Sequence, residues 1–371
     1  MAKKIYVGVD SKARKVKKGY IGVDNKARKI KKAYIGVGGV ARPCFTGGEL
    51  AYYGTATNLS SARYDLAATT VGNYALFGGG INSSTRYSTV DAYDTSLTRT
   101  TPTALSYLRN GLAATTIGNY ALFGGGHSGS AYRTAVDAYD TSLTRTTPTA
   151  LSAARNMLAA ASIGNYALFA GGSTGSSASN VVDAYDTSLT LTKPTTLSNA
   201  CYSLAATTVG NYALFGGGNN GDESLSKVDA YDTSLVRTTP AVLSLARRSL
   251  TAATVGNYAL FGGGTNGSNL DIVDAFNTSL VRTTPTVLSL ARYNLSATAV
   301  GDYALFGGGY TGVVRNTTDA YNTSLTRTAA HALSAAREDA AVTTVGDYAL
   351  FGGGHLSGSS GSAAVDAYTV Q

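Results

Sequence analysis

Hydrophobic and polar positions along this chain are grouped in short runs that return in the same order. In the first block, runs rich in small and apolar residues cover 66–71, 74–79 and 90–94, and a more polar run follows at 97–104. Runs of about four to eight residues bounded by Gly, Asn, Asp or Ser are typical of β-strands. We therefore expect four strands per block, named A to D in chain order.

The block returns along most of the chain. The tetrapeptide Tyr-Ala-Leu-Phe begins at Tyr74, Tyr120, Tyr166, Tyr212, Tyr258, Tyr303 and Tyr348, so the period is 45 or 46 residues. Units of this length with four antiparallel strands indicate the blades of a β-propeller. The prediction is an all-β fold in which residues 49–371 form a seven-bladed β-propeller of four-stranded antiparallel blades.

Proline positions indicate which strand is outermost. Proline falls in the predicted strand D of five blocks, at Pro102, Pro148, Pro194, Pro240 and Pro285. Because proline cannot donate to a ladder, strand D should form the outer edge and the Ala- and Thr-rich strand A the inner one. The last block lacks strand D, and residues 50–57 match its pattern. We expect this N-terminal segment to complete the seventh blade and close the ring.

Charge divides the chain near residue 48. Residues 1–48 hold 13 Lys and Arg against two Asp, whereas the rest holds 17 basic and 20 acidic residues. This basic arm has a period of 15 residues, with apolar strands expected at 5–9, 20–23 and 34–37. Two or three hairpins bury little apolar surface alone. We therefore expect residues 1–48 to be a small β-hairpin arm that docks or oligomerises.

The basic strands of the arm allow two interpretations. The charged residues of the first repeat are Lys12, Arg14, Lys15, Lys17 and Lys18. They would form an anion-binding patch for nucleic acid, or the solvated face of an assembly module. Proteins that bind nucleic acid usually place aromatic rings beside such charges, whereas Tyr6, Tyr20 and Tyr34 lie in the apolar strands. We favour the solvated face and do not expect nucleic acid as a partner.

Two regions differ from block to block, namely the B–C loops and the two residues after the motif Leu-Ser-x-Ala-Arg. In an antiparallel blade the B–C and D–A connections emerge at the same end, so these positions should share one face. The side chains that we assign to a ligand-binding face are Tyr64, Arg86, Tyr87, His127, Tyr132, Arg133, Tyr202, Arg248, Tyr293, Tyr310, Arg315 and His355. Ordinary tolerance of surface loops is the alternative explanation.

An arginine ends the Leu-Ser-x-Ala-Arg motif in six blocks, and Cys201 takes its place in the fourth. The six are Arg63, Arg109, Arg155, Arg247, Arg292 and Arg337. They would ring the mouth of the central channel as an anion site, or they would pair with the aspartates of strand C. Repeated charges of this kind are more often structural, so we favour pairing with Asp91 and its copies.

The sequence offers little support for catalysis. His127, His331 and His355 come from different blocks and lack the spacing of metal ligands. A nucleophile elbow and paired catalytic carboxylates are also missing from the sequence. We expect no catalytic residues, no metal and no cofactor, and therefore a protein that is not an enzyme.

Two resemblances add to this description. The glycine doublet after strand B and the Tyr-Asp of strand C resemble those of kelch-type β-propellers, over residues 49–371. The arm, with its segments YIGV, KARKVKK and YIGVGG, is similar to short leaders of virion proteins in tailed bacteriophages and prophages of Gram-positive bacteria. The second resemblance implies a virion protein such as a tail fibre, made in the bacterial cytoplasm.

The N-terminus lacks the apolar core of a secretory signal peptide, and no stretch approaches the roughly 18 apolar residues of a membrane span. We hypothesise a non-enzymatic virion protein, without membrane insertion, that binds other virion proteins or itself through residues 1–48 and forms a homo-oligomer. Its propeller would bind a host-surface glycan or protein through the variable face. The alternatives are a purely structural decoration or fibre subunit and an intracellular protein-interaction scaffold.

Overall fold

The computed structural model describes residues 6–9, 12–15, 20–23, 26–29, 33–37, 40–45, 48–358 and 360–371. Contacts divide the chain into two compact units, residues 1–51 with 370–371 and residues 52–369. Every regular element within the described ranges is a β-strand, which confirms the all-β prediction.

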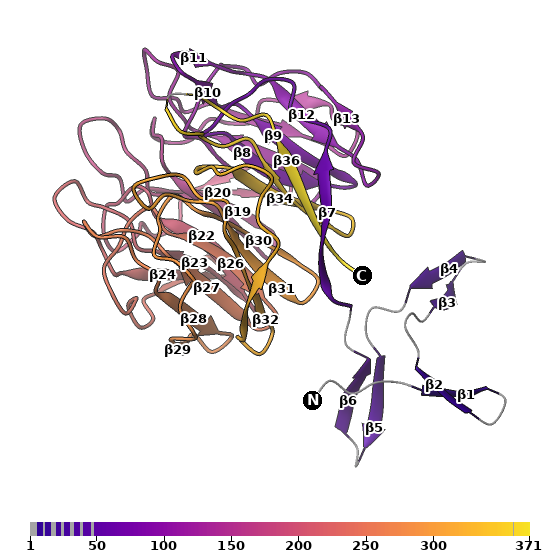
Figure 1. Cartoon of the computed structure of the whole chain (residues 1–371). Coiled ribbons are helices and arrows are strands. Elements are labelled where there is room, and N and C mark those ends of the chain that lie inside the picture. Colours follow the sequence, from indigo (N-terminus) through magenta and orange to yellow (C-terminus); the bar gives the residue numbers. More distant parts are fainter. Residues whose placement is uncertain are drawn as a thin grey trace. The chain divides into compact units, whose positions relative to one another are not determined.

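The arm contains three separate two-stranded antiparallel sheets (Figure 1). They are β1 (Tyr6–Val9) with β2 (Lys12–Lys15), β3 (Tyr20–Val23) with β4 (Lys26–Lys29), and β5 (Ala33–Val37) with β6 (Val40–Phe45). The last pair includes a strand that the sequence pattern did not predict. The sequence predicts basic strands at 13–18 and 27–32, and residues 16–18 and 30–32 of these strands lie outside the described residues.

Seven four-stranded antiparallel sheets form the blades of the propeller, numbered here in chain order. Blades 1 to 3 are β8 (Ala67–Val71), β9 (Tyr74–Gly78), β12 (Val90–Tyr93) and β13 (Arg99–Thr100); β14 (Ala113–Ile117), β15 (Tyr120–Gly124), β16 (Val136–Tyr139) and β17 (Arg145–Thr146); β18 (Ala159–Ile163), β19 (Tyr166–Ala170), β20 (Val182–Asp186) and β21 (Leu191–Thr192). Blades 4 and 5 are β22 (Ala205–Val209), β23 (Tyr212–Gly216), β24 (Val228–Asp232) and β25 (Arg237–Thr238); β26 (Thr251–Val255), β27 (Tyr258–Gly262), β28 (Val273–Asn277) and β29 (Arg282–Thr283). Blades 6 and 7 are β30 (Ser296–Val300), β31 (Tyr303–Gly307), β32 (Thr318–Asn322) and β33 (Arg327–Ala330); β34 (Ala341–Val345), β35 (Tyr348–Gly352), β36 (Val365–Val370) and β7 (Leu50–Ala56).

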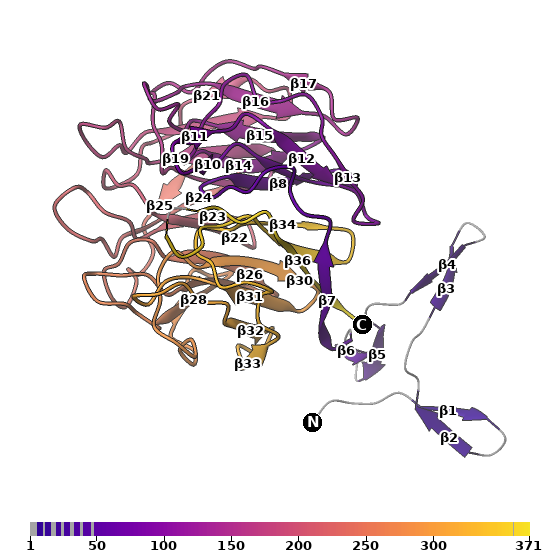
Figure 2. The same ribbon diagram turned by 45° about the horizontal axis from the view of Figure 1, so that its top comes forward.

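The seventh blade joins the two ends of the propeller. Its sheet has the order β34-β35-β36-β7, so the N-terminal β7 supplies the outer strand as predicted. Figure 1 shows β7, near the start of the colour scale, beside the yellow β36. The inner strands contact one another in series around the ring, and β34 contacts β8 (Figure 2). The closed seven-bladed propeller is thereby confirmed.

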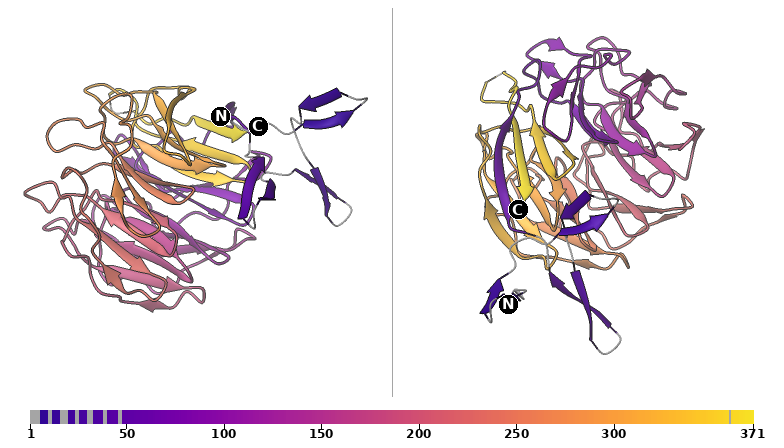
Figure 3. Two further views of the ribbon diagram at one scale, coloured as in Figure 1. Left: turned by 90° about the horizontal axis from the view of Figure 1, so that it is seen from below. Right: turned by 90° about the vertical axis from the view of Figure 1, so that its right-hand side faces the viewer.

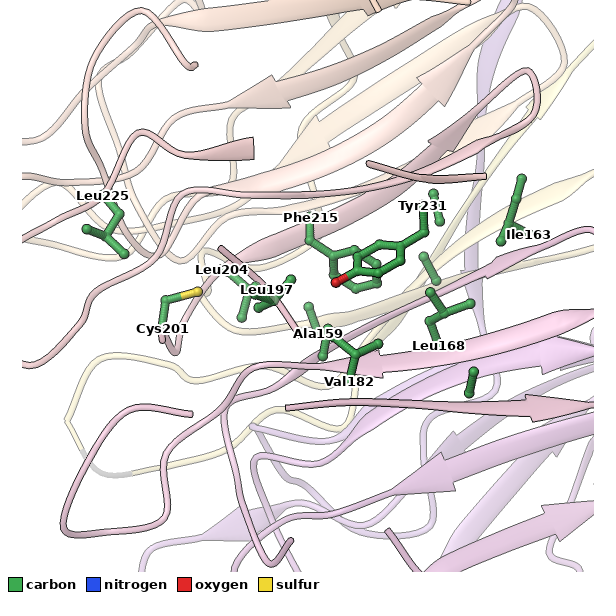
Figure 4. Close-up of a cluster of buried hydrophobic side chains, with 14 residues drawn as sticks. Ala159, Ile163, Leu168, Val182, Leu197, Cys201, Leu204, Phe215, Leu225 and Tyr231 are labelled. Atoms are coloured by element: carbon green, nitrogen blue, oxygen red, sulfur yellow. The ribbon is translucent and has the colours of Figure 1, made fainter. Parts of the chain in front are cut away.

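The blades lie side by side around the ring (Figure 3), and side-chain packing between neighbouring blades holds them together. One hydrophobic cluster joins Leu168 and Val182 of blade 3 to Phe215 and Tyr231 of blade 4, and Figure 4 shows these side chains facing one another. Gly78 ends strand B of blade 1 against the ring of Phe123 in blade 2, where a Cβ would lie 2.8 Å from the Phe123 Cε1 atom. The glycines of the Tyr-Ala-Leu-Phe-Gly repeat therefore give blades room to approach.

The outer strands are shorter than predicted. We expected strand D of blade 1 over 97–104, but β13 covers only Arg99–Thr100. Leu97 has a left-handed φ of 62° in the preceding turn, and Pro102 lies just after the strand rather than within it. Proline ends the ladder because it has no N–H to donate.

Blade 1 has a short hairpin in addition to its four main strands. It consists of β10 (Ile81–Asn82) and β11 (Thr85–Arg86) and occupies the first B–C loop. The hairpin carries Arg86, one of the residues predicted for the ligand-binding face.

Candidate ligand-binding face

The B–C loops and the residues after each Leu-Ser-x-Ala-Arg motif meet at one end of the propeller, which we call the loop face. Tyr64 and Ile81 exchange two backbone hydrogen bonds, with N to O distances of 2.9 and 2.8 Å. The same bridge recurs in every blade, as in Tyr293 with Tyr310 and Glu338 with His355. The backbone therefore brings the two variable regions together, as the antiparallel topology predicts.

All twelve residues predicted for the ligand-binding face are half-buried on the loop face. Several form aromatic pairs. The rings of Tyr293 and Tyr310 have centroids 5.5 Å apart, and those of Tyr64 and His355 lie 4.6 Å apart across the boundary between blades 1 and 7. These pairs leave part of each ring exposed, which suits contact with a ligand.

Two of the twelve also link one loop to the next. The Arg86 Nε atom donates to Asn110 Oδ1 at 2.8 Å, and its guanidinium crosses from blade 1 to the loop of blade 2 at Gly129. The ring of Tyr132 in blade 2 likewise covers Gly175 of blade 3, where a Cβ would lie 2.4 Å from the Tyr132 Cε2 atom. These side chains therefore fix the shape of the face as well as lining it.

The remaining predicted residues occupy equivalent places in different blades. The backbone N–H groups of Tyr87, Arg133 and Arg315 donate to the second glycine of their own B–C loops. The Arg315 Nε atom donates to Thr311 Oγ1 at 2.8 Å. Tyr202 and Arg248 bridge Asn219 and Thr265 through their backbones. Equivalent backbone positions thus have different side chains in different blades.

The six repeated arginines lie inside the blades. Each side chain is 0% exposed, and its Nη2 atom donates to the strand-C aspartate of the same blade. In blade 2 the distance from Arg109 Nη2 to Asp137 Oδ2 is 2.6 Å, and the same Nη2 donates to the Phe123 carbonyl. These arginines do not offer their charge at the channel mouth, which corrects that alternative. Pairing with strand C is their observed arrangement.

Blade 4 lacks this buried pair because Cys201 replaces the arginine. Its aspartate, Asp229, accepts from Ser198 N and Oγ, while Arg237 Nε remains 3.7 Å from Asp229 Oδ1. Burial raises the pKa of Asp229 above its usual range, and the Ser198 hydrogen bonds and Arg237 only partly oppose this. The Cys201 thiol is buried in the hydrophobic cluster of blades 3 and 4 and has a raised pKa of about 12.

The mouth of the central channel is a cavity of about 530 Å³ on the loop face. It is ringed by the second residue after each motif, and all seven have left-handed φ values of 51–62°: Asp65, Gly111, Met157, Ser203, Ser249, Asn294 and Asp339. Each of the last six donates its backbone N–H to the carbonyl of the preceding member, at 2.8–3.0 Å. The backbone of the rim is thus uniform while its side chains vary.

One sector of this rim is acidic. Loss of hydration, with the nearby Asp65 and Glu338 carboxylates, holds the pKa of Asp339 well above its usual range. The Asn294 amide donates to Glu338 Oε2 at 2.9 Å and to Asp339 Oδ2 at 3.1 Å. His355 Nδ1 lies 3.2 Å from Glu338 Oε1. Burial and the close carboxylates therefore disfavour the charged form of Asp339.

A second cavity of about 510 Å³ lies on the loop face between blades 1 and 2, and we call it the Tyr107 groove. Its walls are Ser88, Ser106, Tyr107, Leu108, Ser128, Ser130 and Arg133. We predicted Arg133 from the sequence but missed Tyr107 and Leu108, because their segment was assigned to the invariant scaffold. The available signal is that the other six blocks have Ala at the position of Leu108.

The part of the chain that the structure describes contains no group of three His, Cys, Asp or Glu side chains arranged to hold a metal ion. His127 and His355 lie in separate blades, and His331 stacks on Tyr52 with centroids 4.1 Å apart. Within the same described ranges, no helix has the length and apolar character needed to cross a membrane.

Comparison with known proteins supports the fold alone. No protein-family model matches the sequence, and no curated protein matches it. Among solved structures, the one titled "Structure of YjhT" aligns with a TM-score of 0.59 and 12% sequence identity. The alignment covers 85% of this chain and 97% of that chain. At this identity the similarity extends to the propeller architecture and carries no statement about ligands or activity.

Proposed function

We propose that the chain is a non-enzymatic kelch-type propeller that binds a host-surface ligand, such as a glycan, through its loop face. The observation that carries this proposal is one-sided variation on a fixed backbone. Twelve large polar or aromatic side chains differ among equivalent positions of the loop face. The opposite face repeats its turns, as in Gly72-Asn73 and Gly118-Asn119. Aromatic and arginine side chains at partly buried positions are the types that dominate binding surfaces.

We assign the protein to the particle of a tailed phage or prophage on the resemblance of its arm. Residues 1–48 would attach the propeller to other virion proteins or to further copies of the chain. The concentration of 13 basic residues in this arm supports a separate role from that of the nearly neutral propeller. Electron microscopy of the particle tests this assignment, since the propeller should lie at its surface with the loop face outward.

A whole-cell binding assay tests the ligand-binding part. Tyr293→Ala and Tyr87→Ala on the loop face should each weaken binding to a susceptible host by about tenfold, the usual effect of losing one aromatic contact. Asn119→Ala on the opposite face is the matched control and should bind like the unmodified protein. Unmodified protein that binds no candidate host would contradict the proposal and favour a purely structural virion subunit.

A further inference from the structure

The Tyr107 groove holds a guanidinium without an anionic partner. The Arg133 Cζ atom lies 4.4 Å from the centroid of the Tyr107 ring, so the charge is stacked on the aromatic face. Among the described residues, no hydrogen bond or ion pair reaches the Arg133 side chain, and its buried Nε is unpartnered. Stacking fixes the plane of the guanidinium and leaves its Nη donors available to a ligand.

The surroundings of Arg133 are positively charged. Arg133 is the only charged residue in the wall of the groove as the structure describes it. Loss of hydration lowers the pKa of His127, and the charges of Arg86 and Arg133 lower it further. Both guanidiniums therefore act on the same small region. This sector of the loop face favours an anion, unlike the rim near Asp339.

The rest of the groove is lined by hydroxyl groups and exposed apolar surface. Ser88, Ser106, Ser128 and Ser130 surround the Arg133–Tyr107 stack. Tyr107 and Leu108 are each 47% exposed. Hydroxyls both donate and accept, as sugar hydroxyls do, and the apolar side chains suit the C–H face of a sugar ring.

The propeller scaffold does not require these apolar residues. In the other six blades, the position of Leu108 is taken by Ala62, Ala154, Ala200, Ala246, Ala291 and Ala336. The position of Tyr107 is taken by smaller or non-aromatic residues in the same blades. Since these blades have the same fold without the bulky pair, a contact specific to the groove explains its presence.

We infer that the Tyr107 groove binds an anionic saccharide, with the carboxylate or phosphate of the sugar on Arg133. This inference rests on the proposed function and names the class of ligand for one part of the loop face. A guanidinium fork pairs with either oxyanion through two N–H donors. A volume of about 510 Å³ is in the range of small-ligand sites. The Ser88 and Ser130 hydroxyls would donate to and accept from the sugar hydroxyls. Ser106 and Ser128 would only accept from them, because their hydroxyls already donate to Asp137 and to the Ala131 carbonyl.

Isothermal titration of the full chain with three monosaccharides tests the inference. Glucuronic acid, glucose 6-phosphate and glucose share a ring and differ in charge. At least one anionic sugar should bind ten times more tightly than glucose, and the preferred one identifies carboxylate or phosphate. Arg133→Gln and Tyr107→Ala should each weaken that binding at least tenfold. Lys193→Gln, which removes an exposed cation of blade 3, should leave it unchanged.

Further ligands and variants distinguish the possible reasons for a negative result. Acetate and inorganic phosphate test whether the saccharide ring contributes, and an aspartyl-glutamate dipeptide tests for an acidic peptide ligand. Equal binding of the dipeptide, or unchanged sugar binding in Arg133→Gln, would overturn the inference. Arg133→Lys keeps the charge without the fork and should retain part of the affinity, and thermal unfolding checks that each variant folds. If Arg133→Gln still binds host cells while the sugars fail, the proposed function stands and this assignment falls.

Discussion

At the scale of single residues, the Arg–Asp pair is the repeated polar element of the core. Six blades bury a guanidinium that donates to a strand-C aspartate and to a strand-B carbonyl. Taking both charges out of water is costly, so the pair adds little net stability compared with an apolar core. Removing one partner is different, because the other charge is left buried alone. Blade 4 has Cys201 in place of the arginine and allows a direct comparison.

Asp137→Asn and Asp229→Asn should therefore have opposite effects. The first leaves Arg109 without its buried carboxylate and should lower the free energy of unfolding by about 3–5 kcal/mol. The second removes a carboxylate whose pKa is raised by burial. A raised pKa in the folded state means that stability is lost as pH rises through that pKa. Asp229→Asn should thus be neutral near pH 3 and stabilising at pH 7, because it removes the cost of ionising a buried carboxyl.

Urea unfolding of both variants and the unmodified chain at pH 3, 5 and 7 checks this contrast. If Asp229→Asn destabilised the protein at pH 7 as strongly as Asp137→Asn, the carboxylate of blade 4 would be stabilised by a partner other than Ser198 and Arg237.

Among single residues, the sequence predicted the Arg–Asp pairing but not the contacts between loops. The Arg–Asp pairing followed from repetition, because the two residues recur together in six blocks with nearly constant separation. The linking roles of Arg86 and Tyr132 could not be predicted, since they depend on how far one loop lies from the next. Tyr107 was missed because its segment was assigned to the invariant scaffold. Its motif is invariant in the backbone, and only the fold reveals that this side chain faces a cavity with Arg133.

At the scale of elements, the length of an outer strand depends on a single residue. Five blades have proline three positions after the first residue of a two-residue outer strand. Blade 6 has Ala330 at this position, and there β33 extends through Ala330 to pair with Thr318. Sequence reasoning placed strand D correctly but overestimated its length, because the segment's composition suits a strand while proline and the left-handed turn residue stop the ladder.

Ala330→Pro should shorten β33 to the length seen in blades with proline. Because five other blades are built with proline here, the loss in free energy of unfolding should be about 1 kcal/mol or less, the value of one ladder hydrogen bond. Amide hydrogen exchange near Thr318 and urea unfolding together measure the change. Thr328→Ala keeps every backbone donor and should preserve exchange protection. A loss of several kcal/mol in Ala330→Pro would mean that blade 6 depends on its longer edge.

At the scale of the whole molecule, the ring depends on β7. Tyr52 in this strand donates its hydroxyl to Asp366 Oδ1 at 2.5 Å, stacks on His331 and meets the edge of Tyr368 with centroids 5.2 Å apart. The closure was predictable because the repeat starts and stops out of phase by one strand. The rim of left-handed residues was not, because it is made of backbone hydrogen bonds between residues of unlike type.

Tyr52→Ala should weaken the closure of the ring. It removes a hydrogen bond to a buried carboxylate and two ring contacts, and we expect the free energy of unfolding to fall by about 2–3 kcal/mol. Tyr53→Ala is the matched control, since Tyr53 is 53% exposed on the same strand and contacts only the edge of Tyr348 among the described rings. Calorimetry and light scattering of both variants measure the change. Equal melting temperatures for the two variants would show that β7 is not a weak point.

The direction of β7 has a mechanical consequence. Tyr52, near its start, lies at the end of blade 7 away from the loop face, because the strand runs from there toward Tyr64. If the loop face holds a host and the arm holds a particle, tension acts along the strand. Ladder hydrogen bonds lie across the strand axis, so the load shears all of them together rather than opening them one by one. An anchor at this point of the ring would resist drag better than one attached to a loop.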